Sequence, residues 1–176
     1  MTTPSQNFDH VLNITSGSDG MHDLQFKAAP ASGQEWHRGA VVTLNAAGAL
    51  IAGKTTEHDM PMFAINATYD LDVVFGQTST ADRGNMTGGK VACFPATGGY
   101  EIFTTEFVAG TYAPNDLLTP AGGGNAGKVT LAEDNYSDAL VCGVVSKGTA
   151  TGIYDQSILH FWPVYIPAVN TAAASV

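Results

Sequence analysis

The segment whose spacing comes closest to a chemical motif is the glycine-rich stretch GGGNAGKV, residues 122–129. It fits the G-x-x-x-x-G-K pattern of a P-loop up to its last position, and it fits G-x-G-x-x-G through Gly122, Gly124 and Gly127. A P-loop needs Ser or Thr after the lysine to hold Mg²⁺, and both motifs need a helix whose N-terminal amides face the phosphate. Val129 follows Lys128, and KVTLAEDN indicates a strand and a turn. The sequence predicts a hairpin loop that does not bind nucleotides.

Other residues with metal-binding or nucleophilic chemistry lack the spacing of a site. Glu57-His58-Asp59 and His22-Asp23 place histidines beside carboxylates, but no H-x-x-x-H pattern or matched carboxylate completes a zinc site. Asp70 and Asp72 alternate with apolar residues, which favours the outward face of a strand over a calcium loop. No G-x-S-x-G elbow and no Cys–His pair at a family spacing is present. We expect no metal, no cofactor and no enzyme activity, although distant residues could still assemble a triad.

The two cysteines, Cys93 and Cys142, lie in the apolar runs KVACF and ALVCGVV. We expect two buried free thiols rather than a disulfide, because nothing in the sequence indicates an oxidising compartment. The first ten residues, MTTPSQNFDH, have neither the basic nor the apolar region of a signal peptide. No run approaches 18 apolar residues, so we expect no membrane span.

Composition narrows the classes of partner. The 176 residues fit one domain, 44% are apolar, only 13% are charged, and the net charge is −9. Nucleic-acid binding needs clustered Lys and Arg, which the chain lacks, and anionic membranes are disfavoured for the same reason. So few charges suggest a surface partly covered by other subunits.

The pattern of the elements is that of an all-β protein. Short runs rich in Val, Ile, Thr, Phe and Tyr alternate with Gly, Pro, Asn and Asp at intervals of about ten residues, and helical periodicity is almost absent. We predict a single β-sandwich or β-barrel domain. The predicted strands are residues 23–28, 40–44, 49–53, 61–66, 71–76, 90–95, 100–108, 128–132, 139–146 and 157–166.

The chain divides into an extended N-terminal arm (1–22), a β domain (23–167) and a flexible C-terminal tail (168–176). The arm is polar except for the patch Val11-Leu12-Asn13-Ile14, which cannot bury itself and which we expect to be disordered or laid on a partner. Four aromatic residues lie near the chain ends: Trp36, Phe161, Trp162 and Tyr165.

These four residues are either part of the core or contacts with another subunit or the capsid. If they are contacts, they form a contact set together with Val11, Leu12 and Ile14.

A weak internal repeat is also present. The stretch from Arg38 to Ile65 and the stretch from Asn115 to Val145 each run from a short strand through a turn, a second short strand and an acidic loop to a buried strand. The repeat suggests two related sheets.

The same stretches carry a family resemblance. RGAVVTLNAAGAL, YAPNDLLTPAGGGNAGKVTLA and ALVCGVVSKG resemble, in their pattern of strands and turns, the capsid decoration (cement) proteins of tailed bacteriophages. The likeness covers roughly residues 24–166. It implies a β-barrel or β-sandwich that binds the major capsid protein on the outer face of an icosahedral head, commonly as trimers, and it supplies no catalytic residues. The 22-residue lead-in is longer than the family minimum.

From the resemblance we expect a structural virion protein on the outer capsid surface that stabilises the expanded head. The arm patch and the four aromatic residues would then contact the capsid or a sister subunit. The alternative is a receptor-binding or tail-fibre β domain, which should carry a concave aromatic site and would usually hang from a stalk that this chain lacks. An enzyme is the third class.

Overall fold

The computed structural model describes residues 12–15, 26–56, 58–65, 68, 90–132, 139–151 and 157–168, with backbone alone for 12–15, 150 and 151. The predicted strand 71–76, most of the predicted arm and nearly all of the predicted tail lie outside these residues. The strands are β1 (Leu12–Thr15), β2 (Phe26–Ala28), β3 (Val41–Leu44), β4 (Leu50–Ala52), β5 (Met62–Ala64), β6 (Val91–Pro95), β7 (Glu101–Thr104), β8 (Leu117–Pro120), β9 (Val129–Leu131), β10 (Val141–Thr151) and β11 (Ser157–Ile166).

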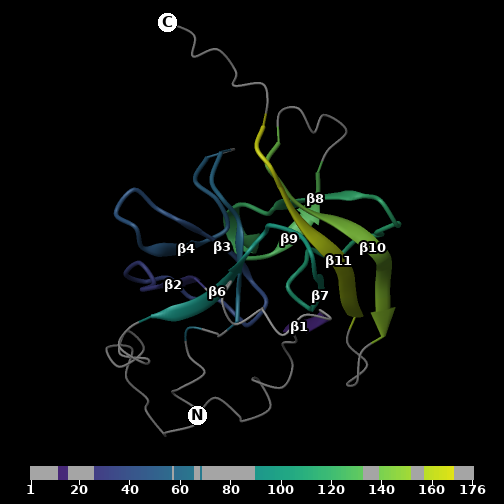
Figure 1. The fold of residues 1–176 in the computed structure, drawn as a ribbon, viewed down its shortest axis with the longest axis horizontal. Helices are drawn as coiled ribbons and strands as arrows, with labels where there is room; N and C mark the ends of the chain where they lie inside the picture. The colour runs from purple at the N-terminus through teal and green to yellow at the C-terminus, as the bar shows by residue number, and fades with distance from the viewer. Residues whose placement is uncertain are drawn as a thin grey trace, which may run out of the picture.

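The strands form two sheets, which confirms the all-β prediction (Figure 1). A five-stranded sheet has the order β2-β6-β5-β3-β4, and a six-stranded sheet has the order β1-β7-β11-β10-β8-β9. Neighbouring strands in both sheets are antiparallel. The two sheets pack against each other, as in a sandwich.

The two sheets share one topology. Replacing β2 to β6 by β7 to β11 converts the order of the first sheet into that of the second, and β1 is an addition outside β7. In each copy, the segment after the first strand also forms a parallel bridge with the third strand. The bridges are Pro30 with Leu50 of β4, and Phe107 with Val129 of β9. Residues 26–95 and 101–166 therefore form two copies of one five-stranded unit, called here the first unit and the second unit. The predicted repeat is confirmed and extends over β2, β6, β7 and β11.

The hydrogen-bond register of the two units also coincides. The pairings of β3 and β8 are Val42 with Ala52 and Met62, and Leu118 with Leu131 and Gly143. Comparing pairings strand by strand gives the matched positions. They are Phe26 and Ile102, Val41 and Leu117, Val42 and Leu118, Leu44 and Pro120, Leu50 and Val129, Met62 and Gly143, Phe63 and Val144, Ala64 and Val145, Val91 and Leu159, Cys93 and Phe161, Phe94 and Trp162, and Pro95 and Pro163.

Two cores follow from this arrangement. The inner face of the first unit forms its own core around Val42, Leu50 and Val91, with Trp36 packed into it. The inner face of the second unit forms a core with the outer face of the first, and the rings of Phe63 and Phe161 lie 5.3 Å apart between centroids. The contact between the units is therefore outer face of the first against inner face of the second.

At two pairs of matched core positions, the side chains of the two units differ in size, and the difference at one pair offsets the difference at the other. The first unit has Met62 and Cys93 where the second has Gly143 and Phe161. A Cβ added at Gly143 would lie 2.6 Å from Cδ2 of Phe161, so the phenyl ring occupies the space that a side chain at 143 would need. The volume lost at one position is regained at the other, which keeps each interior close-packed.

Three strand predictions need correction. The predicted list omits β8 as a strand of its own. The strand predicted over 100–108 ends at Thr104, because the Thr104 hydroxyl accepts a bond from the Glu106 amide (3.0 Å) and donates to the Gly39 carbonyl (3.3 Å), which turns the chain out of the ladder. The arm segment 12–15 pairs with the chain's own β7 instead of requiring a partner. An open edge of backbone N–H and C=O groups is enough to hold a short strand.

Candidate docking surfaces

The glycine-rich loop is a hairpin connection, as predicted. It joins β8 to β9 through a single 3-10 turn, Gly123–Asn125, and β9 follows Lys128 directly. Gly127 has φ of +92°, and a Cβ there would meet the side chains of Ala40 and Ala52 at 3.6 and 3.5 Å. The glycine thus serves a close contact between the two units. A strand, rather than a helix N-terminus that could face a phosphate, follows the loop.

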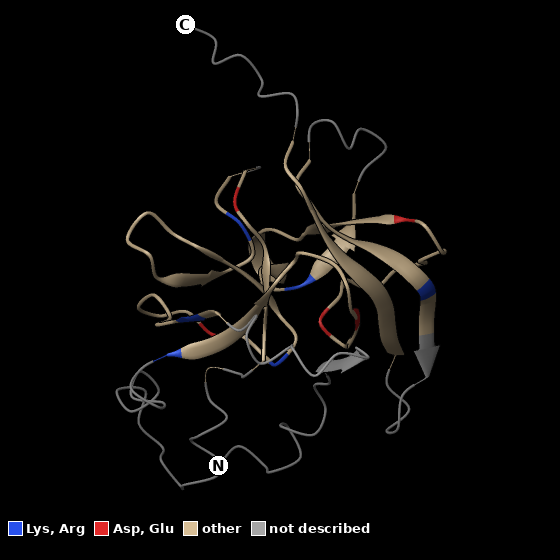
Figure 2. Ribbon diagram, viewed as in Figure 1, with Lys and Arg blue, Asp and Glu red and all other residues tan. Residues whose placement is uncertain are grey.

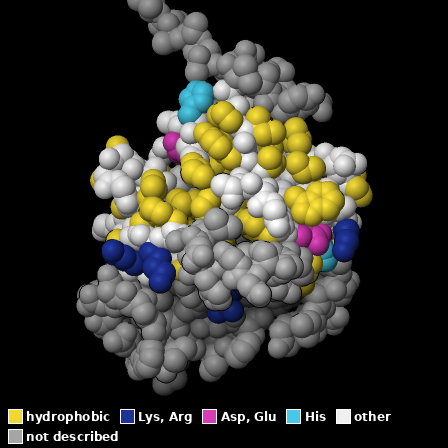
Figure 3. Space-filling view, viewed as in Figure 1, with side chains coloured by type: hydrophobic (Ala, Val, Ile, Leu, Met, Phe, Trp, Pro, Cys, Tyr) yellow, Lys and Arg dark blue, Asp and Glu magenta, His cyan; other side chains and the backbone are white. Residues whose placement is uncertain are grey.

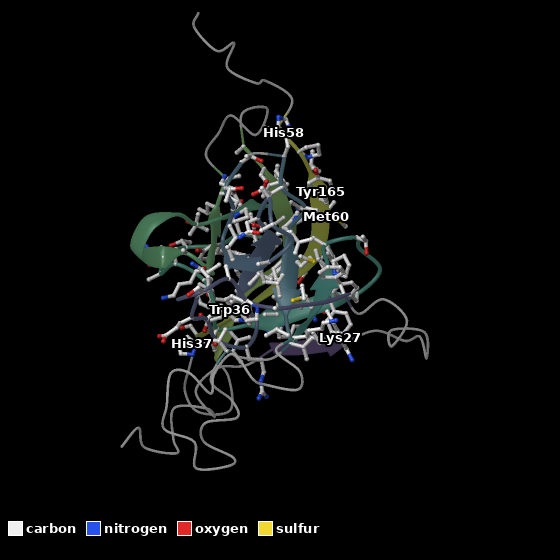
Figure 4. All side chains as sticks on the ribbon, turned by 90° about the vertical axis from the view of Figure 1, so that its left-hand side faces the viewer. Lys27, Trp36, His37, His58, Met60 and Tyr165 are labelled. Carbon is white, nitrogen blue, oxygen red and sulfur yellow. The ribbon has the colours of Figure 1, made fainter. Side chains whose placement is uncertain are left out.

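A polar cleft lies beside this loop, lined by Glu35, Trp36, His37, Glu106 and Lys128, with a volume of about 220 Å³. Trp36 is only 4% exposed, and its amide donates to the Thr68 hydroxyl at 3.1 Å. The indole therefore belongs to the core of the first unit and offers the cleft no open aromatic face. Figure 4 places Trp36 and His37 together at this end of the unit.

Both cysteines are free and buried, as predicted. Burial raises the pKa of Cys93 to about 12. Burial also raises the pKa of Cys142, and the nearby Lys54 opposes that shift only in part. Both groups remain thiols at neutral pH, and a thiol is a poor nucleophile.

Of the residues predicted as contacts, those with described side chains take different places in the fold. Val11 lies outside the described residues, and Leu12 and Ile14 are described only through their backbone in β1. Trp36 and Phe161 are core residues. Tyr165 is half-buried, and its hydroxyl donates to the His58 carbonyl at 2.9 Å. Figure 4 labels both residues at the same end of the molecule. Trp162 is 50% exposed and is the residue of this set that stands at the surface.

Trp162 lies on the outer face of the second unit. β11 alternates buried residues such as Leu159 and Phe161 with more exposed ones such as His160 and Trp162. Figure 2 shows no charged position along β11. The ring of His160 packs against Phe103, with centroids 4.2 Å apart. Desolvation lowers the pKa of His160; Glu101 opposes this shift and Lys147 adds to it.

A second apolar surface lies on the first unit. Phe26, Leu44, Met60, Met62 and Pro95 line a groove of about 170 Å³. Phe26, Leu44 and Met60 are 38%, 37% and 44% exposed. Sequence reasoning missed this groove. The available signal was large apolar residues beside turns, since Leu44 directly precedes the turn at Asn45 and Met60 shortly follows the turn at His58.

Apolar side chains are gathered on one face of the molecule (Figure 3). Figure 3 shows hydrophobic side chains gathered over β11 on the right and over the five-stranded sheet on the left. Single exposed apolar residues are ordinary, but contiguous apolar surface indicates an interaction site.

The edges of the sheets are a third surface. Edge strands β1 (LNIT) and β9 (VTL) contain no charged residue and no proline. The outer side of β4 is already occupied, because Leu50 exchanges main-chain hydrogen bonds with Ala29 and Ala31. Beyond its bridge at Val129, β9 has no further strand on its outer side among the described residues, and Leu131 there is 38% exposed. Soluble proteins usually guard edge strands with Lys, Pro or bulges.

The chain matches no protein-family model, no curated protein and no solved structure. Among the described residues, no three His, Cys, Asp or Glu side chains gather closely enough to hold a metal ion. Within the same part of the chain, no helix has the length and apolar character to cross a membrane.

Proposed function

We propose that this chain is a capsid decoration protein, which binds the major capsid protein on the outer surface of a phage head and stabilises the expanded lattice. The observation that supports it best is the set of uncharged edge strands, of which β9 with Leu131 is the clearest. An edge strand of this kind can extend a neighbour's sheet through main-chain hydrogen bonds, with side-chain contacts setting the register.

The role needs binding and no covalent chemistry. A ligand that binds only the expanded lattice stabilises it by mass action, by about 2.7 kcal/mol per site when its free concentration is 100 times Kd. The net charge of −9 suits a position outside the head, away from packaged DNA. Attachment through main-chain and apolar contacts should weaken only modestly with salt, because screening acts mainly on exposed charges.

The test is to mix the purified protein with undecorated expanded heads and to measure site occupancy and the temperature of DNA release. Leu131→Lys places a charge on the open edge of β9, and Leu131→Ala is the matched control that removes apolar area without adding a charge. We expect the wild type and the alanine variant to bind and to raise the release temperature, and the lysine variant to bind at least tenfold more weakly.

Absence of wild-type binding, or binding without any change in the release temperature, would contradict the proposal and would favour the receptor-binding alternative. Equal binding by the lysine variant would rule out β9 as the attachment edge. Glycan or cell-surface binding by the isolated protein would support the receptor-binding class directly.

A further inference from the structure

Several matched positions of the two units differ in exposure to solvent. These differences indicate which residues are covered by the contact between the units. On the outer face, Phe63 and Phe94 of the first unit are 0% and 7% exposed, whereas Trp162, the match of Phe94, is 50% exposed. On the inner face the difference in exposure is reversed. Ile102 of the second unit, which lies in the core between the units, is fully buried, and its match Phe26 is 38% exposed. Matched positions share the same place in their own unit, so the neighbouring unit causes the difference.

The same reversal holds around these residues. Val41 is buried on the outer face of the first unit, and its match Leu117 is partly exposed. Pro163 is buried in the second unit, and its match Pro95 is partly exposed in the groove. Among the described residues, therefore, no other unit packs on the outer face of the second unit. The first unit likewise has a receiving groove that the chain's other unit does not fill.

We propose that these two surfaces bind each other between copies of this chain, with Trp162 of one copy entering the groove formed by Phe26, Leu44 and Met60 of a second copy. The contact inside the chain indicates which positions meet, because Trp162 matches Phe94 and Phe26 matches Ile102. The likeness is limited to the rim of the groove, since the deeper positions of the first unit, such as Val42 and Cys93, are buried in its own core. A partly exposed Trp against an apolar groove is the usual chemistry of an interface hot spot.

Each copy carries one Trp162 face and one groove, so a closed pair uses both surfaces of both copies. A twofold axis between two copies brings the Trp162 face of each onto the groove of the other, so that two identical contacts form and neither surface is left to bind a third copy. The proposed oligomer is therefore a dimer, whereas the family resemblance implies a trimer.

Electrostatics permits this contact despite the acidity of the chain. β11 carries no charged residue, and Glu101 and Lys147, which both act on His160, bring charges of opposite sign to the margin of the outer face. The groove is lined by five apolar residues. Two copies therefore meet through surfaces with little net charge. This inference does not depend on capsid attachment, because pairing would occur in solution without heads.

The experiment is sedimentation velocity with the full chain over a range of concentrations, with Trp162→Lys altering the face, Leu44→Glu altering the groove, and Gly122→Ala as an exposed control outside both. We expect the wild type and the control to sediment at twice the 18.3 kDa of one chain. Loss of a hot-spot residue weakens one contact by about 30-fold, so each variant, which alters two contacts, should weaken pairing by about 1000-fold. Circular dichroism checks that each variant keeps its β structure.

Mixing the two variants makes the test specific. In a mixed pair, one contact is unaltered, and the other brings the introduced ammonium group of the face variant against the introduced carboxylate of the groove variant. Pairing should therefore return although each variant alone is monomeric. Monomeric wild type at high concentration, failure of the mixture to pair, or a complex of three chains would overturn the twofold pairing. A self-association that survives both substitutions would place the contact elsewhere and overturn it as well.

Discussion

The substitution Gly143→Ala tests the packing of the second unit. The added methyl carbon would lie 2.6 and 3.0 Å from two ring carbons of Phe161, against about 3.5–4.0 Å for an ordinary carbon contact. The ring would have to move by about 1 Å. Phe161 is fully buried and already packs on Phe63. Overpacking of this kind costs about 1–3 kcal/mol.

The assay is urea and thermal unfolding of a double-mutant cycle. A loss of about 2 kcal/mol should lower Tm by about 4–8 °C for a chain of this size. Phe161→Ala alone should cost about 3–5 kcal/mol, because it leaves a cavity. In that background the alanine at 143 meets no ring and fills part of the space. The double variant should therefore cost less than the sum of the singles by about 1–3 kcal/mol.

Gly122→Ala is the control, because Gly122 has φ of −107° and nothing lies within 4 Å of an added Cβ. It should change stability by less than about 0.5 kcal/mol. If Gly143→Ala costs the same with and without Phe161, the steric explanation of the Gly143–Phe161 exchange is wrong.

Three further predictions follow from other parts of the molecule. Because His160 has a lowered pKa, the unfolded chain binds its proton more readily than the native protein, so the unfolding free energy should fall as pH drops below the ordinary value of 6.5. Urea unfolding of the wild type and of His160→Gln across that range checks this, and an unchanged pH slope in the variant would contradict it. Deleting residues 1–22 removes β1 but leaves both five-stranded units, so it should cost less than about 3 kcal/mol while weakening attachment to heads; loss of the β circular dichroism signal would show that the arm belongs to the core. The protein should not bind ATP, since a strand follows Lys128, and micromolar affinity by calorimetry that is lost in Lys128→Ala would refute this.

The fold class could be predicted because the strands alternate with clear turn residues, as at Asn45 to Gly48 and at Gly122 to Gly127. Strand ends were harder, since the end of β7 depends on the hydrogen bond that the Thr104 hydroxyl donates to the carbonyl of Gly39, far along the chain. Such a long-range contact leaves no local pattern in the sequence. The repeat was visible only over its middle strands, because matched residues differ elsewhere, as Cys93 and Phe161 do.

The docking surfaces could be predicted only in part. Composition singled out the aromatic residues near the chain ends, but Phe161 and Trp162 are adjacent in sequence and lie on opposite faces of β11. Which of the two is exposed depends on where the first unit packs. The groove residue Phe26 is matched with the fully buried Ile102, so its exposure follows from the arrangement of units and not from its residue type.

The two cores also give the chain an order of assembly. Every member of the first core lies within the first unit, whereas the second core includes Val41, Phe63 and Phe94, which the first unit supplies. During synthesis the first unit leaves the ribosome first and can form its core before the second unit adds the contact of Gly127 with Ala40 and Ala52. The second unit then folds onto a surface that is already formed. In native-state hydrogen exchange we expect the second unit to open without the first, and opening of the first to expose both.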